Sequence, residues 1–151
     1  MKDAFAATKT KKASFEVATY LAMYPFQPLL EFVEQCNHIL KFFRNHHVVK
    51  AQLRELQITS GARTLARQAP TRWGTIQAMC ATLLQSERHL HSIVSARDFV
   101  QGSYAQKCER KKVKDAVVQE EFVNNLNKVL SILGPIHRRI VKYQSDKVPI
   151  S

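Results

Sequence analysis

The sequence predicts an all-α protein, and three observations carry this prediction. Apolar residues make up 45% of the 151-residue chain, enough to form a buried core. Long segments repeat these residues at intervals of three and four, the period of a helix with one buried face. Only 4 glycines and 5 prolines interrupt them, and no stretch alternates apolar and polar residues as a half-buried strand does. We therefore expect about four helices in an irregular bundle, roughly over residues 28–56, 72–96, 112–133 and 135–144.

The first predicted helix follows two prolines, Pro25 and Pro28. Prolines so close together exclude a continuous helix across them, and Pro28 suits a first helical turn. Residues 1–27 show no helical stripe and carry a lysine-rich stretch. We therefore expect an irregular basic N-terminal segment over 1–27 and a single helical domain over 28–151. The apolar stripe of the first helix consists of Leu29, Phe32, Val33, Cys36, Ile39, Leu40 and Phe43.

The second predicted helix begins at the only tryptophan of the chain. Pro70 disfavours helical geometry at the residue before it, and the Thr71 hydroxyl suits an N-cap. Arg72 and Trp73 would then fill the first turn. Two interpretations of this pair stay open. Trp73 packs against the preceding helix, or Arg72 binds a phosphate while Trp73 stacks on a base.

The third and fourth predicted helices lie on either side of Gly134 and Pro135, which we expect to stop or kink the chain. Before them, residues 107–114 read KCERKKVK, and five of these eight side chains are cationic. We interpret this stretch as a basic turn after a break at Gly102. Either it is simply solvated, or it binds a phosphate backbone with release of counterions.

Charge and composition limit the function classes. The net charge of +11 favours acidic partners such as nucleic acid, and the last third of the chain carries the largest share of it. Three cysteines without a Cys-x-x-Cys spacing predict neither a disulfide framework nor a zinc knuckle. The N-terminus lacks a signal-peptide pattern, and no apolar run approaches the roughly 20 residues of a membrane span. We expect an intracellular protein that does not enter a membrane.

The sequence offers no convincing catalytic or metal-binding set. Cys36 and His38 are two residues apart and point to different sides of a helix, so they cannot hold one metal ion. Glu120 and Glu121 are adjacent and diverge by about 100°, so they cannot flank one bond. We expect both carboxylates to face solvent, and we expect no catalytic residue, metal or other cofactor.

Three ordered landmarks resemble one family. Thr71-Arg72-Trp73-Gly74-Thr75 is similar to the Thr-Arg-Trp/Phe-x-Ser/Thr segment of hAT-type DNA transposases, which belong to the RNase H-like superfamily. Upstream, residues 42–47 with the following Leu53-Arg54-Glu55 resemble the family's Phe-x-Asn-His helix end. Downstream, residues 133–136 and 144–149 resemble its Pro-Ile/Val, helix, Asp-x-x-x-Pro run. Together the landmarks cover roughly residues 28–150.

The resemblance implies a fragment of such a transposase. It begins after the family's first two catalytic aspartates and ends within the helical insertion that precedes the catalytic glutamate. We therefore expect no enzyme activity, and Met1 would open the chain partway through the catalytic domain. By the same resemblance Arg72 and Trp73 would contact DNA, whereas Asp146 falls in the insertion and would not be catalytic. Gly74 stands where the family often has a polar residue.

Two functional hypotheses follow. The first is a catalytically incomplete, nuclear fragment with non-specific DNA affinity. The second is a helical protein-interaction module that dimerises with another copy or with a transposase-derived partner through apolar surface. An autonomous nuclease is disfavoured because no set of metal-binding carboxylates is present. The residues expected to bind DNA under the first hypothesis are Arg63, Arg67, Arg72, Trp73, Lys107, Arg110, Lys111, Lys112 and Lys114.

Overall fold

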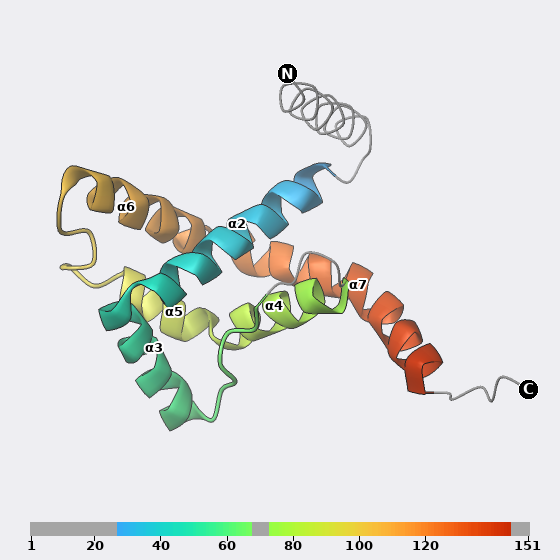
Figure 1. The fold of residues 1–151 in the computed structure, drawn as a ribbon. Coiled ribbons are helices and arrows are strands. Elements are labelled where there is room, and N and C mark those ends of the chain that lie inside the picture. The colour runs from blue at the N-terminus through green and yellow to red at the C-terminus, as the bar shows by residue number, and fades with distance from the viewer. Residues whose placement is uncertain (1–26, 68–72, 146–151) are drawn as a thin grey trace, which may run out of the picture. The chain divides into compact units, whose positions relative to one another are not determined.

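The computed structural model describes residues 27–67 and 73–145, without the side chains of Trp73, Gln144 and Ser145. These residues form helices and no strand, which confirms the all-α prediction. The chain divides into two units after Val33, and the core discussed below belongs to the second. Among the described helices, none is long and apolar enough to cross a bilayer. The helices are α2 (Gln27–Asn45), α3 (His47–Ser60), α4 (Trp73–Gln85), α5 (Glu87–Val94), α6 (Tyr104–Val118) and α7 (Glu121–Ser145) (Figure 1).

The expected number of about four helices was wrong, because bends divide the segments predicted over 28–56 and 72–96. The first bend lies at His46, whose backbone is extended with ψ 104°. The His46 ring supports this bend, since Nδ1 donates to the Phe42 carbonyl oxygen at 2.9 Å. The second bend lies at Ser86, with φ −96° and ψ 4°. No glycine or proline marks either position.

The boundaries of the last two predicted helices were also wrong. The basic stretch 107–114 is no turn but the middle of α6, and the chain leaves this helix at Gln119, where ψ is 130°. The final helix, α7, then runs without interruption through Pro135. Proline crowds the Cβ of the residue before it, and Gly134 has no Cβ. Because Gly134 has no Cβ to clash with the proline ring, the helix continues through Pro135. It loses one backbone hydrogen bond, since proline has no N–H.

The core of the second unit forms where α4 packs along α7 and where α5 packs against both α3 and α6. Phe42, from α2, packs edge-on against Phe99, with ring centroids 5.8 Å apart. The expected stripe of the first helix is confirmed in large part, since most of its members are buried. Among the side chains that the structure describes, the largest fully buried ones are Phe42, Phe43, Phe122, Ile39, Leu40, Met79, Leu83, Leu90, Leu126, Val94, Val113 and Val129.

Two of the three cysteines join α2 to α4 inside this core. Cys36 and Cys80 are fully buried free thiols. The hydrogen bond to the Cys80 thiol, together with burial, raises the pKa of Cys36 well above its usual range. A thiol held protonated in an apolar interior is a poor nucleophile. Cys36 therefore acts as the core residue that the sequence predicted.

Buried polar side chains fix the path of the chain around α4. The Gln57 amide of α3 donates to the Ser86 hydroxyl at 2.8 Å, and both side chains are buried. One turn earlier, Thr82 Oγ1 accepts from the backbone N–H of Ala66 at 2.9 Å. Because buried polar groups without partners are costly, these bonds select one position for α3 and one for the connection after it.

Pro135 provides a direct test of the continuous α7. It is exposed, so replacing it with alanine removes no core contact while restoring the missing backbone N–H. We expect Pro135→Ala to raise the free energy of unfolding by about 1–3 kcal/mol. Thermal and urea denaturation followed by circular dichroism measure this. Asn127→Ala, also exposed on α7, is the control and should give only about 0.5 kcal/mol. A destabilised Pro135→Ala variant would contradict a helix that runs through this position.

Candidate nucleic-acid interface

The candidate interface rests on α6, whose start is set by a capping box. The Ser103 hydroxyl accepts from the backbone N–H of Gln106, and the Gln106 side chain accepts from the backbone N–H of Ser103. This reciprocal pair is the local signal that could have revealed the helix in the sequence. The apolar stripe of α6 is short, with Val113, Ala116 and Val117 buried, which explains why periodicity alone missed it.

Three of the four lysines of α6 lie on one side of the helix, away from its buried stripe. Lys107, Lys111 and Lys114 are spaced i, i+4, i+7 and so lie within about 60° of one another around the helix axis. We call these three residues the α6 lysine stripe. Lys107 and Lys111 are exposed and Lys114 is half-buried, and no ion pair to them is recorded within residues 27–67 and 73–145. Lys112 is exposed on another side of the helix.

An aromatic side chain extends the α6 lysine stripe at its N-terminal end. Tyr104 is 86% exposed and lies one turn before Lys107 on the same face. A phenol ring beside lysines can stack on a base while the lysines hold the backbone. Asp115, also exposed, is the acidic residue that borders this face. Sequence reasoning missed Tyr104 because it placed the first turn of this helix in a loop.

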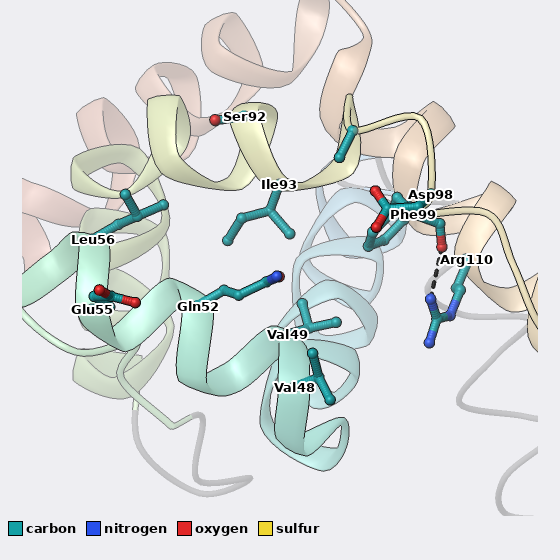
Figure 2. A pocket seen from close by; sticks show the side chains of 11 residues that line it. Val48, Val49, Gln52, Glu55, Leu56, Ser92, Ile93, Asp98, Phe99 and Arg110 are labelled. Carbon is teal, nitrogen blue, oxygen red and sulfur yellow. Dashed lines mark hydrogen bonds between the residues drawn. The ribbon is translucent and has the colours of Figure 1, made fainter.

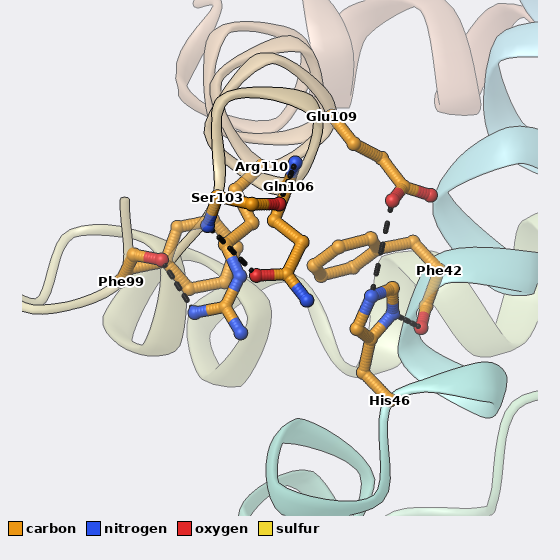
Figure 3. Close-up of polar contacts among 7 residues, drawn as sticks. All are labelled: Phe42, His46, Phe99, Ser103, Gln106, Glu109 and Arg110. Atoms are coloured by element: carbon orange, nitrogen blue, oxygen red, sulfur yellow. Dashed lines mark hydrogen bonds and ion pairs between the residues drawn. The ribbon is translucent and has the colours of Figure 1, made fainter. Parts of the chain in front are cut away.

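Arg110 differs from the lysines around it because its guanidinium is partly buried and bonded to the backbone of the preceding connection. Its Nη1 donates to the Phe99 carbonyl oxygen at 2.8 Å, and its Cζ lies 5.8 Å from the centroid of the Phe99 ring (Figure 3). Arg110 thus fastens the connection before α6 to the helix itself. The structure gives Arg110 this contact within the fold, and its predicted binding of nucleic acid stays a prediction.

The acidic residue of the basic cluster points away from the α6 lysine stripe. Glu109 Oε2 lies 3.8 Å from Nε2 of His46, at the bend between α2 and α3 (Figure 3). These side chains are 42% and 26% exposed, so the pair contributes little to stability. The pair keeps the Glu109 carboxylate at the α2–α3 bend, so this carboxylate does not neutralise the lysines of the α6 lysine stripe.

The predicted arginines form a second, separate set. Arg63 and Arg67 are exposed on the connection between α3 and α4. Residues 68–72, and with them Arg72, lie outside the described residues, as does the side chain of Trp73. The connection between α3 and α4 is held to α4 by a hydrogen bond from the Ala66 N–H to Thr82, whereas α6 packs on α5. The described structure therefore places the predicted cations on two surfaces rather than on one.

A groove of about 740 Å³ lies beside Arg63, between this connection, α4 and α7. Polar side chains from all three segments face it, with small residues between them. At the α7 side, His137 stands against Gly74, where a Cβ would lie 2.9 Å from the imidazole Nδ1. Sequence reasoning missed this groove because its members are dispersed along the chain. They are Arg63, Thr64, Ala66, Gln77, Ala78, Ala81, Thr82, Gln85 and His137.

A second groove, of about 410 Å³, lies between α3, α5 and the connection before α6 (Figure 2). Its walls include the apolar side chains of Val49, Ile93 and Phe99, with the carboxylates of Glu55 and Asp98 among them. The two carboxylates outnumber Arg110, the cation that also lines this groove, so the groove is poorly suited to a phosphate. It is therefore not part of the candidate nucleic-acid interface.

No cluster of three or more histidine, cysteine or carboxylate side chains able to hold a metal ion occurs within residues 27–67 and 73–145. Glu120 and Glu121 are exposed, as the sequence predicted. Comparisons with protein families, with curated proteins and with solved structures give no match to this chain.

The different positions of Arg110 and Lys111 predict mutational effects of different size on the free energy of unfolding. Arg110→Gln removes a charged hydrogen bond to a carbonyl, so we expect a loss of about 1–2 kcal/mol in the free energy of unfolding. Lys111→Gln, on the exposed face, should change it by less than about 0.5 kcal/mol. Denaturation curves of the two variants measure this difference. Equal stabilities would mean that Arg110 is as dispensable to the fold as its neighbour.

Proposed function

We propose that this chain is a non-enzymatic DNA-binding protein that contacts the phosphate backbone through the α6 lysine stripe. The observation that carries the proposal is the alignment of Lys107, Lys111 and Lys114 on one helix face without a recorded ion pair in the described structure. The axial span of these residues is about 10 Å, which reaches about three successive phosphates of one strand. Binding of this kind is electrostatic and does not depend on base sequence.

The resemblance to hAT-type transposases extends the proposal. On this proposal the chain is a catalytically incomplete fragment of such an enzyme. The fragment acts in the nucleus and retains only the affinity for DNA. Arg63 and Arg67 are exposed and available for further backbone contacts. Arg72 and the side chain of Trp73 lie outside the described residues, so they belong to the proposed interface by the sequence pattern and the resemblance. The net charge of +11 supports a polyanionic partner of this kind.

Substitution of the stripe tests the proposal. We compare the Lys107→Gln/Lys111→Gln/Lys114→Gln variant with the unchanged protein by fluorescence anisotropy on a labelled duplex at several salt concentrations. Loss of three phosphate contacts should reduce the slope of log affinity against log salt by about 2.7.

Asp115→Asn should tighten binding, because it removes the carboxylate beside the stripe.

The matched control changes three lysines outside α6. Lys41, Lys50 and Lys128 are exposed on α2, α3 and α7, and their replacement by glutamine lowers the net charge equally. If both triple variants lose the same affinity, binding depends on total charge and the stripe has no special role. If the unchanged protein does not bind duplex at low salt, the proposed function fails.

A second function, dimerisation, is favoured by an apolar stripe on α7. Ile132 and Ile136 are 44% and 46% exposed, and Tyr143 is 80% exposed. Their spacing of i, i+4 and i+11 places all three on one helix face. Exposed apolar side chains arranged in this way are typical of helix-to-helix interfaces. We propose that a second copy of the chain would bind here if the protein is an interaction module.

Light scattering coupled to size exclusion tests the second function. A dimer would have twice the 17.3 kDa mass of the chain, and Ile132→Glu/Ile136→Glu should return it to a monomer. Ile58→Glu is the control, because Ile58 is 71% exposed on α3. A monomeric unchanged protein at high micromolar concentration, or a dimer insensitive to the double substitution, would refute the α7 interface.

A further inference from the structure

The groove between residues 61–67, α4 and α7 has the chemistry of a site for a negatively charged ligand. Its volume of about 740 Å³ lies in the range of small-molecule sites in proteins. Among the described residues that line it there is no aspartate or glutamate, whereas Arg63 contributes an exposed guanidinium. A phosphate in this groove would therefore meet a cation and no like charge from these residues.

The floor of the groove suits a flat group. Ala66, Ala78 and Ala81 line it, and their side chains do not extend beyond Cβ. Gln77 and Gln85 stand on the same helix eight residues apart, about 12 Å along the axis. A carboxamide both donates and accepts hydrogen bonds, which is what the edge of a nucleobase requires. A base lying over the alanines would have a carboxamide within reach on either side.

The groove is held in shape before any ligand arrives. Thr82 Oγ1 accepts from the Ala66 backbone N–H at 2.9 Å and donates to the Ala78 carbonyl oxygen at 3.0 Å. These bonds hold the connection against α4 and reduce the ordering that binding would require. On the other wall, Nδ1 of His137 is buried and has no hydrogen-bond partner among the described residues. That nitrogen is packed against Gly74, where a Cβ would lie 2.9 Å from it, so the imidazole closes this wall of the groove and Nδ1 is not open to a ligand.

We propose that this groove binds one nucleotide unit of a single DNA strand, with its phosphate at Arg63 and its base over the alanine floor between Gln77 and Gln85. The inference rests on the proposed DNA binding and adds a preference for unpaired nucleotides. A duplex keeps its bases stacked and paired inside the helix, so it presents only phosphates to the groove. A flexible single strand can place both groups there.

Two substitutions in the groove test this inference. Ala81→Leu fills the floor with a residue of similar helix propensity, and Arg63→Gln removes the cation. We measure the affinity of the full chain for a labelled single-stranded oligonucleotide and for a duplex of equal length. Each variant should bind the single strand about tenfold more weakly, the loss expected for one charged hydrogen bond or one stacked base. Duplex affinity should change less than twofold for Ala81→Leu.

The controls are Ala51→Leu on α3 and Arg88→Gln on α5, which make the same changes at exposed positions outside the groove. They should leave the affinity for the single strand within about twofold of the unchanged protein. Circular dichroism confirms that every variant is folded.

The outcomes separate the two proposals. If duplex binding depends on the α6 lysine stripe but Ala81→Leu and Arg63→Gln bind single strands normally, the groove inference is overturned and the proposed function stands. If the unchanged protein binds neither form of DNA, both are overturned. Adenosine monophosphate, tested by amide chemical shifts in nuclear magnetic resonance, should perturb Gln77 and Gln85. Equal perturbation by inorganic phosphate alone would show a simple anion site and overturn the nucleotide assignment.

Discussion

The buried hydrogen bond between Gln57 and Ser86 is the constraint on which the arrangement of the helices depends. It joins residues 29 positions apart, and it lies at the bend where α4 gives way to α5. Both groups are shielded from water, so breaking the bond would leave a buried amide and a buried hydroxyl without partners. This would lower the free energy of unfolding by about 1–3 kcal/mol. The bond therefore sets where α3 lies and, through the bend, directs α5 between α3 and α6. The adjoining bond from Ala66 to Thr82 fixes the connection in the same way.

This framework decides which cations are available to a ligand. Arg110 is tied to Phe99 and supports the start of α6, whereas the lysines around it face solvent. Arg63 is carried by the connection that Thr82 holds, so its guanidinium stands beside α4. The two surfaces differ chemically. The α6 face offers point charges and one phenol ring, and the α4 groove offers a cation with carboxamides on either side of an apolar floor.

Periodicity predicted much of the core, because burial of one helix face leaves a regular trace in the sequence. Cys36, Ile39 and Leu40 illustrate this, since all lie on the expected stripe and all are buried. The bends at His46 and Ser86 could not be predicted, because each is stabilised by a side-chain bond rather than marked by glycine or proline.

Only part of the candidate site could be predicted from the sequence, because the rest depends on tertiary contacts. The basic stretch 107–114 was recognised from composition, yet its helical state places only some of its charges on one face. The structural contact of Arg110 depends on Phe99, eleven residues away, and no local pattern reports it. The groove was missed because Arg63, Gln77 and His137 come from three segments and share no spacing. Only tertiary packing brings them together.

Pro135 has a consequence for the last turns of α7. Figure 1 shows α4 lying along α7, with the final part of α7 extending past it, and the contact between Gly74 and His137 marks the edge of this packing. The proline removes a backbone hydrogen bond at this edge, where the helix loses its neighbour. The terminal turns, which carry Arg138 and Arg139, are consequently easier to tilt than the packed half. Their two arginines therefore lie on the part of α7 that the packing of α4 constrains least.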